Sequence, residues 1–215
     1  VMVLKNISFK SARFIGGTAL VWAHGNPRFS EDLDFTGVLR PQALRKNLDR
    51  AAGEIQGWLA LAPRISAPKK NGATWKLTCA LSPSESVRLH VDTQPHPAIT
   101  HFPAVIRFSG ISPFVVASVE LEEIMADKII ALAGRRYLSG RDLFDLWFHW
   151  LSQPNRDGLG VKIMALLKPK LLARGLGLAA LLLALKQRLE TPESLQRARQ
   201  EWGRYLPPSF HQKSV

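Results

Sequence analysis

Two aspartates, Asp32 and Asp34, lie two residues apart in a short apolar segment of the chain. In a strand, successive side chains alternate between faces, so both carboxylates would project from one face and Leu33 from the other. Neighbouring carboxylates repel each other unless a cation lies between them. Oxygen-only ligands suit Mg²⁺ or Mn²⁺, and Mg²⁺ is commonly held by one or two carboxylates together with substrate phosphates. The pair therefore predicts a catalytic metal site.

A glycine pair upstream of these acids predicts a phosphate-binding turn. Gly16, Gly17 and Thr18 end a short apolar run, and glycine lets the backbone turn sharply and lets a phosphate approach its N–H groups. A helix that starts near Thr18 adds free N–H groups and the positive end of its dipole. Arg28 and Ser30 can bind further phosphate oxygens. The alternative is a tight turn followed by a surface aspartate pair, but the coincidence of several parts of a phosphoryl-transfer site favours nucleotide binding.

A third acid, Asp92, ends an alternating run in which Arg88, His90 and Asp92 share one face. If this strand neighbours the strand with the aspartate pair, Asp92 becomes a third metal ligand. The alternative is an exposed aspartate at a strand end. Because the aspartate pair already needs a cation, the metal site is the favoured interpretation.

Lys128 lies on an apolar helical stripe, four residues from both Ile124 and Leu132. A lysine on a core-facing stripe needs a partner. It can extend its ammonium group to the surface, or it can reach an anion in a cleft. Because the chain also carries the glycine and aspartate motifs, contact with nucleotide phosphates is the favoured role.

Two further acids belong to a predicted helix in which Asp142, Asp145 and His149 share one face, opposite an apolar face with two tryptophans. Ser139 precedes Asp142 by three residues, so Asp142 can be part of a helix cap and nothing more. The other possibility is that this polar face completes the active-site cleft. Arg141 can pair with Asp145, and His149 is expected to be structural because a lone histidine usually is.

The first motifs together resemble a known family. Gly16-Gly17-Thr18-Ala19-Leu20, followed by Arg28-Phe29-Ser30-Glu31-Asp32-Leu33-Asp34-Phe35, is similar to the signature of the AbiEii/AbiGii toxin family of bacterial nucleotidyltransferases. This family is a branch of the DNA polymerase β-like superfamily. The superfamily pattern is Gly-Ser, a spacer and Asp-x-Asp; here Thr18 replaces the serine and keeps a hydroxyl.

The later motifs extend the resemblance. The segment from Glu123 through Lys128 to Arg135 resembles the family's lysine helix, and Arg141-Asp142-Leu143-Phe144-Asp145 resembles its Arg-Asp-x-x-Asp helix. The family places an essential aspartate in the second motif, and the interval from Lys128 favours Asp142 over Asp145. The resemblance therefore implies that Asp32, Asp34, Lys128 and Asp142 are catalytic.

The resemblance also implies a toxin of a type IV toxin–antitoxin or phage-abortive system. Such a toxin would transfer NMP from an NTP to an RNA acceptor, such as the 3′ end of tRNA. The resemblance also implies a cognate antitoxin, with or without direct contact between toxin and antitoxin. One alternative is a small-molecule nucleotidyltransferase of the antibiotic-modifying type, which predicts an acidic acceptor pocket. Another is a catalytically inactive protein that binds nucleotide or RNA.

The composition is that of a folded, basic chain. With 215 residues and 46% hydrophobic content, it can bury a full core. Lys and Arg exceed Asp and Glu by 29 to 17, and the formal charge of +12 favours RNA as partner, with the basic residues of 162–174 and 186–204 as candidate phosphate contacts. The single cysteine, Cys79, excludes an internal disulfide and predicts a cytoplasmic location. The longest apolar stretch, 176–185, is about half of a bilayer span and predicts a buried helix, with no membrane partner.

Periodicity predicts an α+β chain. Together with the resemblance, it predicts a polymerase β-like nucleotidyltransferase core of mixed sheet and helices over 1–110 and a helical bundle lobe over 111–215 that completes the cleft. Strands are expected over 11–15, 32–36, 63–67, 73–81, 86–92 and 104–108. Helices are expected near 18–24, 40–59, 118–135, 141–151, 158–168, 171–189 and 192–204.

Overall fold

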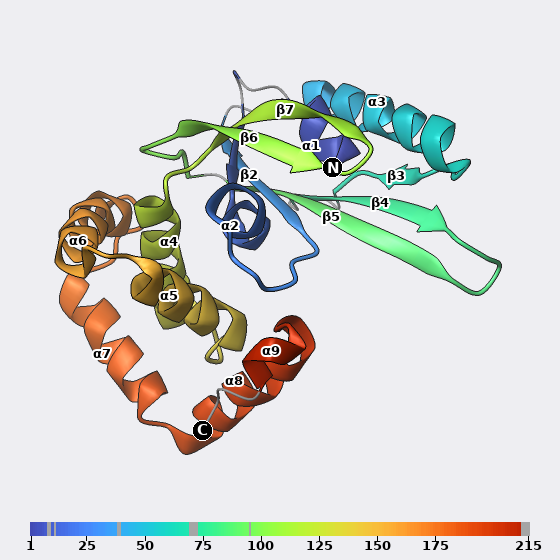
Figure 1. Ribbon diagram of the computed structural model, residues 1–215. Helices are drawn as coiled ribbons and strands as arrows, with labels where there is room; N and C mark the ends of the chain where they lie inside the picture. Colours follow the sequence, from blue (N-terminus) through green and yellow to red (C-terminus); the bar gives the residue numbers. More distant parts are fainter. Residues whose placement is uncertain (8–9, 11, 38–39, 69–72, 95, 212–215) are drawn as a thin grey trace. The chain divides into compact units, whose positions relative to one another are not determined.

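The computed structural model describes residues 1–7, 10, 12–37, 40–68, 73–94 and 96–211 (Figure 1). The chain forms two compact units, and neither follows the sequence without interruption. Unit 1 contains Val1–Ala23 and Glu31–Val119, whereas unit 2 contains His24–Ser30 and Glu120–Val215. The last passage of the chain from unit 1 to unit 2 thus lies after Val119, and a short segment of the N-terminal half belongs to the helical unit.

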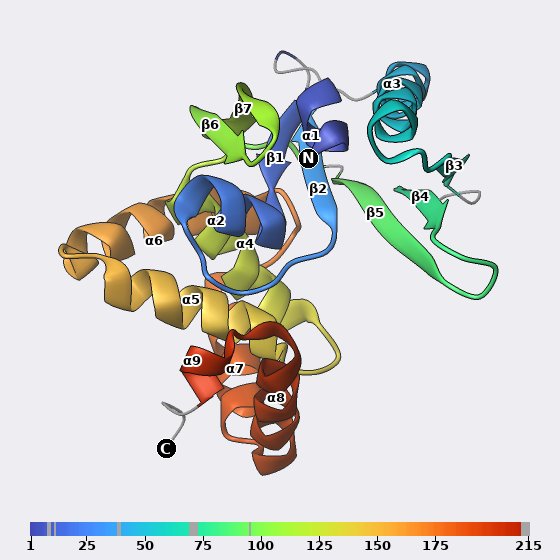
Figure 2. The ribbon, with the colours of Figure 1, turned by 45° about the vertical axis from the view of Figure 1, so that its right-hand side comes forward.

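Unit 1 is built on a mixed sheet. Within the described residues it has seven strands in the order β3-β4-β5-β2-β1-β7-β6 (Figures 1 and 2). The strands are β1 (Ala12–Ile15), β2 (Leu33–Gly37), β3 (Arg64–Ser66), β4 (Thr74–Ala80), β5 (Ser86–Gln94), β6 (Phe102–Phe108) and β7 (Ile111–Ser118). β2 pairs with β5, and β1 with β7, in parallel; the other neighbours are antiparallel. The helices are α1 (Met2–Asn6), α2 (Gly16–His24) and α3 (Pro41–Leu59).

One face of this sheet is apolar and carries α1 and α3 (Figures 1 and 2). Phe14 of β1 and Phe35 of β2 are direct cross-strand partners, and their ring centroids lie 5.7 Å apart. Leu44 and Leu48 stand one helical turn apart on α3 and are buried. Large apolar side chains on one face of the sheet and one stripe of the helix make this the hydrophobic core of unit 1.

The six predicted strands are present, with ends that differ by a few residues. The sequence prediction missed β7 and began a helix at residue 118, whereas α4 (Leu121–Gly134) begins at Leu121. β7 has an irregular burial pattern, because Val116, Ala117 and Ser118 are all buried in succession. Without alternation, the period-2 signal of a half-buried strand is lost.

Unit 2 is helical in its described part. Besides α4, it contains α5 (Gly140–Ser152), α6 (Arg156–Leu172), α7 (Leu178–Leu189), α8 (Pro192–Tyr205) and α9 (Pro208–His211). The core between α4, α6 and α7 is formed by Met125, Ala126, Ile130, Leu159, Ile163, Leu167, Leu171 and Leu181. No helix in the described part of the chain has the length and apolarity needed to cross a bilayer.

The start of α5 packs closely on α8. A Cβ at Gly140 would overlap the backbone of Ala198, so only glycine allows this approach. The indole Nε1 of Trp202 donates a hydrogen bond of 2.7 Å to the carbonyl of Gly140, and the Gly140 N–H donates one of 2.6 Å to Glu201. These bonds attach α8 to the first turn of α5.

The break between α6 and α7 differs from the prediction. α6 continues through Pro169 to Leu172, and the chain turns at Gly175, whose φ of +65° is left-handed. The N–H of Leu176 donates to the Leu171 carbonyl over 2.9 Å, as in a glycine-dependent helix cap. Glycine terminates this helix, while Pro169 is tolerated near its end.

A buried ion pair joins α4 to α6. Lys170 Nζ lies 2.7 Å from Glu123 Oε1 and 2.8 Å from Asp127 Oδ2, and Glu123 is fully buried. Arg174 also pairs with Asp127, at 3.1 Å. Removing one partner of such a pair leaves the other charge buried and uncompensated, which is strongly destabilising.

Lys170→Met is therefore expected to lower the free energy of unfolding by about 3–5 kcal/mol, measured by urea denaturation. The double variant Glu123→Gln/Lys170→Met should recover much of that loss because no buried charge is stranded. The matched control is Lys168→Met, at an exposed position of the same helix. Equal losses in the Lys170 and Lys168 variants would contradict the assignment.

Candidate active site

The predicted phosphate turn lies where β1 ends and α2 begins. Gly16 has φ +82°, a backbone conformation that favours glycine. A Cβ at this position would overlap the carboxylate of Asp34 and lie only 2.9 Å from its Cβ and Cγ atoms. The glycine thus lets the acid of β2 lie directly against the first turn of α2, where N–H groups are free of intrahelical partners.

Thr18 connects the same two elements. Its buried hydroxyl donates a hydrogen bond to the backbone carbonyl of Asp32. The bond holds the residue before β2 against the first turn of α2. The hydroxyl of Thr18, part of the predicted phosphate-binding turn, therefore also positions the start of the aspartate strand.

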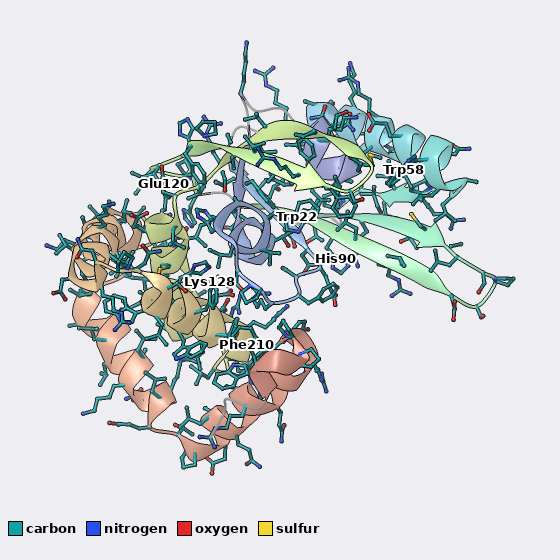
Figure 3. All side chains as sticks on the ribbon, viewed as in Figure 1. Trp22, Trp58, His90, Glu120, Lys128 and Phe210 are labelled. Atoms are coloured by element: carbon teal, nitrogen blue, oxygen red, sulfur yellow. The ribbon has the colours of Figure 1, made fainter. Side chains whose placement is uncertain are left out.

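The parallel pairing of β2 with β5 brings the three predicted metal ligands to one region of unit 1. Asp34 and Asp92 are register partners, so their side chains share a face of the sheet. Thr74 of β4 donates its hydroxyl hydrogen to Asp92 Oδ1. His90, labelled in Figure 3, lies two residues before Asp92, and its Nδ1 is 3.2 Å from Asp32 Oδ1.

The donor chemistry of this region fits a hard divalent cation. Asp32 keeps 43% of its side-chain surface exposed, which allows access by an ion and a triphosphate. Within the described residues, no group of three or more His, Cys, Asp or Glu side chains is gathered closely enough to form a complete metal site. Two carboxylates are sufficient for Mg²⁺ when substrate phosphates supply further ligands.

The predicted residues of the later motifs meet in unit 2. Lys128, labelled in Figure 3, is 8% exposed, and its Nζ lies 2.6 Å from Asp142 Oδ1 and 2.7 Å from Asp145 Oδ2. Arg135 pairs with the other oxygen of Asp142. Burial by itself would raise the pKa of Asp142, but the charges of Lys128 and Arg135 outweigh it and lower that pKa below its ordinary value.

Asp145 is the most deeply buried of these acids. Arg28 Nε and Nη2 donate to its two oxygens over 2.5 and 2.8 Å, and Asn26 Nδ2 donates over 2.8 Å. Arg28 Nη1 donates to the carbonyl of Phe29, and the Arg28 backbone N–H donates to Asn26 Oδ1. Asp145 thereby holds the 24–30 segment on α5.

His149 completes this network as a neutral residue. Burial lowers its pKa to about 4, against the opposing effect of Asp145. Its Nε2 lies 3.3 Å from Asn26 Nδ2, and a neutral imidazole can accept this hydrogen bond. The structural role expected of His149 is thus a contact with the same segment that Asp145 holds.

The structure groups the predicted site residues by unit. Gly16, Gly17, Thr18, Asp32, Asp34 and Asp92 belong to unit 1, and Arg28, Ser30, Lys128, Arg141, Asp142 and Asp145 belong to unit 2. The pairing of Arg141 with Asp145 is wrong: Arg141 stacks over the ring of Tyr205 at 4.6 Å, and Asp145 is already saturated by other donors.

Sequence reasoning missed several polar partners. Arg135 follows Lys128 by seven residues, two helical turns, and this spacing could have placed both near Asp142. His90 shares the face of Asp92 by simple alternation, but its contact with Asp32 depends on strand order. Asn26 carries no signal in the sequence, because its partners on α5 lie far along the chain.

A protein-family model matches almost the whole chain. The model of the nucleotidyl transferase AbiEii toxin, type IV toxin–antitoxin system, matches residues 4–214. The chain belongs to the AbiEii family. It is therefore a nucleotidyltransferase of the type IV toxin class, with a nucleotide as substrate and an antitoxin as genetic partner. Among curated proteins, none matches the sequence significantly.

Solved structures show the same nucleotidyltransferase fold. MenT4, a nucleotidyltransferase toxin from Mycobacterium tuberculosis H37Rv, is 15% identical with a TM-score of 0.58, and the match covers 92% of this chain and 84% of that one. JHP933 from Helicobacter pylori is 20% identical with a TM-score of 0.51, and the match covers 91% of this chain and 93% of that one. At these identities, the likeness of this AbiEii-family chain to both concerns the fold.

The two late aspartates should differ in their contribution to stability. Asp145→Asn strands the buried Arg28 and is expected to lower the free energy of unfolding by about 3–5 kcal/mol. Asp142→Asn should cost about 1–2 kcal/mol, because Lys128 keeps Asp145 and the half-exposed Arg135 can be hydrated. Urea denaturation of both variants measures the difference, and a larger loss for Asp142→Asn would refute this ranking.

His149 should make stability depend on pH. Between about pH 6.5 and 4 the unfolded chain protonates this imidazole and the folded chain does not, so the free energy of unfolding falls as the pH is lowered through that window. We expect a loss of about 2 kcal/mol after allowance for solvent screening. Asp142 adds to this loss of stability only at a pH below its ordinary pKa of 3.8, because its pKa in the folded chain is lowered.

Denaturation curves from pH 4.5 to 7 measure this dependence. His149→Gln keeps an acceptor for Asn26 but does not titrate, so its stability should change less with pH. His101→Gln, at an exposed position, is the control and should follow the wild type. The same pH slope in the His149 variant and the wild type would contradict the assignment.

Proposed function

We propose that the protein transfers NMP from an NTP to an RNA acceptor hydroxyl, such as the 3′ end of tRNA, with Mg²⁺ or Mn²⁺ held by Asp32 and Asp34. One observation carries the proposal: the Asp34 carboxylate lies directly against the glycine turn at the start of α2. A cation ligand and a phosphate-binding helix terminus are thus adjacent. This is the combination that transfer of a phosphoryl-linked nucleotide needs.

The chain's own residues then have distinct tasks. The N–H groups of Gly16 and Gly17 and the dipole of α2 attract triphosphate oxygens. Asp32 is positioned by the contact of Thr18 with its carbonyl and of His90 with its carboxylate. Asp92, oriented by Thr74, is proposed as a third ligand.

The bound cation would make the acceptor hydroxyl a better nucleophile and neutralise charge on the triphosphate. In-line attack at the α-phosphorus forms the bond to the acceptor oxygen and releases pyrophosphate. The protein supplies positioning and charge, without a covalent intermediate.

The cations of unit 2 are proposed to assist with phosphate charge. Lys128, Arg135 and Arg28 are three cations that share the two carboxylates of Asp142 and Asp145, so the positive charge of this cluster is only partly compensated. Ser30 is half-buried at the end of the 24–30 segment. Arg28 is fully engaged with Asp145, so phosphate binding by Arg28 would require that pair to open.

RNA is the acceptor that the charge of the chain favours. The formal charge of +12 disfavours a small cationic acceptor, for which an acidic pocket would be expected, and favours a polyanion. The antibiotic-modifying alternative predicts transfer that does not depend on RNA. An inactive nucleotide binder predicts no pyrophosphate release.

Asp32→Asn and Asp34→Asn should each lower transfer by at least about a hundredfold, because each removes a charged cation ligand. The assay supplies each of the four labelled NTPs with total tRNA, followed by sequencing of the RNA 3′ ends. Thermal unfolding checks that both variants fold. Asp49→Asn, on the exposed surface of α3, is the matched control and should retain transfer.

Retained transfer in the folded Asp32 and Asp34 variants would refute the proposed site. Label that appears without added RNA, or on a small molecule in its place, would refute the proposed acceptor. The identity of the added nucleotide follows from the same sequencing reads.

A further inference from the structure

The sheet of unit 1 carries basic side chains next to the predicted metal ligands. Cross-strand register defines the rows of this face. Asp34, Asp92 and Thr74 form one row across β2, β5 and β4. Continuing along β5 away from Asp92, His90 lies opposite Lys76 in the next row.

The row beyond it contains two arginines. Arg88 of β5 is opposite Thr78 of β4, and Thr78 is opposite Arg64 of β3. Directly paired residues point to the same side of a sheet, and every second residue of a strand does too. Arg64, Lys76 and Arg88, here called the basic strip, therefore share the face of Asp34 and Asp92.

This face is open, whereas the opposite face of the same strands is covered. Trp75 and Leu77 alternate with Lys76 along β4, so they point to the opposite face, and both are buried. All three strip residues are exposed. Within the described part of the chain, no carboxylate forms an ion pair with any of them.

Three of the basic residues predicted earlier as phosphate contacts differ in this respect. Lys162 pairs with Glu122, Lys170 with Glu123 and Asp127, and Arg174 with Asp127. Their charge is largely compensated inside unit 2. The cations of the strip, which have no such ion pair, therefore attract a polyanion more strongly than these three residues do.

We propose that the basic strip binds the phosphate backbone of the RNA acceptor. The proposal rests on the proposed function, because it takes its ligand from that reaction. Arg88 lies four residues from Asp92, about 13 Å along the strand, so successive cations lead away from the acid site in steps that suit successive phosphates. Guanidinium groups bind phosphate oxygens in pairs, and Thr78 adds a hydroxyl between the two arginines.

An open β-sheet surface suits a nucleic-acid strand. Positively charged grooves and sheets follow the backbone of RNA without reading its sequence. A polyanion bound here would extend directly from the row of Asp34 and Asp92. An acidic protein segment would be attracted in the same way, but nothing in its chemistry requires one of its ends to lie at the predicted cation ligands.

The triple variant Arg64→Gln/Lys76→Gln/Arg88→Gln tests the proposal. Binding of a fluorescein-labelled tRNA transcript is measured by anisotropy, without NTP, over a range of NaCl concentrations. We expect at least about a tenfold loss of affinity at low salt. The slope of log K against log salt concentration should become less negative by about two, since three phosphate contacts are removed. NTP affinity should stay within about twofold of the wild type.

The matched control is Arg40→Gln/Lys46→Gln/Arg50→Gln. These exposed residues lie on α3 or directly before it, and their replacement removes the same formal charge. Affinity of the control for RNA should change much less. Thermal unfolding verifies that both triple variants are folded.

An equal loss of RNA affinity in the two triple variants, or none in the strip variant, would overturn the proposal. So would a strip variant that loses affinity for poly-L-glutamate alone. Strip-dependent RNA binding in a wild type that transfers no nucleotide would overturn the proposed reaction and support the RNA surface. RNA binding that does not depend on the strip, together with intact nucleotide transfer, would support the proposed reaction and overturn the RNA surface.

Discussion

The buried carboxylate of Asp145 is the charge on which the helical unit depends. It receives hydrogen bonds or ion pairs from Arg28, Asn26 and Lys128, so three donors compensate one desolvated anion. Because such a group is costly to bury without partners, arrangements that break these contacts are disfavoured. That arrangement fixes the rotation of α5 and places Asp142 beside Lys128. It also fixes the segment that joins the phosphate turn to the aspartate strand.

This network reverses the usual orientation of an amphipathic helix. On α5, the face with Asp142, Asp145 and His149 is buried, whereas Trp147 and Trp150 are 48% and 39% exposed. A hydrophobic-face argument alone would turn this helix the other way. Hydrogen bonds and opposite charges supply the compensation that apolar burial supplies elsewhere in the unit. Polar residues thus act here as the specific contacts of the interior.

The local parts of the site could be predicted from the sequence, and the long-range parts could not. Alternation and a glycine turn were enough to place Asp34 beside the start of α2, because the chain between them is short. The resemblance selected Lys128 and Asp142 as site residues but did not predict that they form an ion pair. The pair of Arg28 and Asp145 spans 117 positions, and no periodicity reports on such a contact. The sequence favoured a position for Asp92 on a strand next to the aspartate pair, but the pairing of β5 with β2 and its register came only from the fold.

The 24–30 segment gives the chain an unusual division. Both flanking elements, α2 and β2, lie mainly in unit 1, yet the residues between them are part of unit 2. The polypeptide therefore passes between the units at three points, and no single cut separates them. A fragment that begins at Glu120 would keep Asp145 and lose Arg28. Recombination that exchanged helical lobes between relatives would have to transfer the 24–30 segment as well. Because this segment lies between the glycine turn and the aspartate pair, the lobe and that motif are expected to be inherited together.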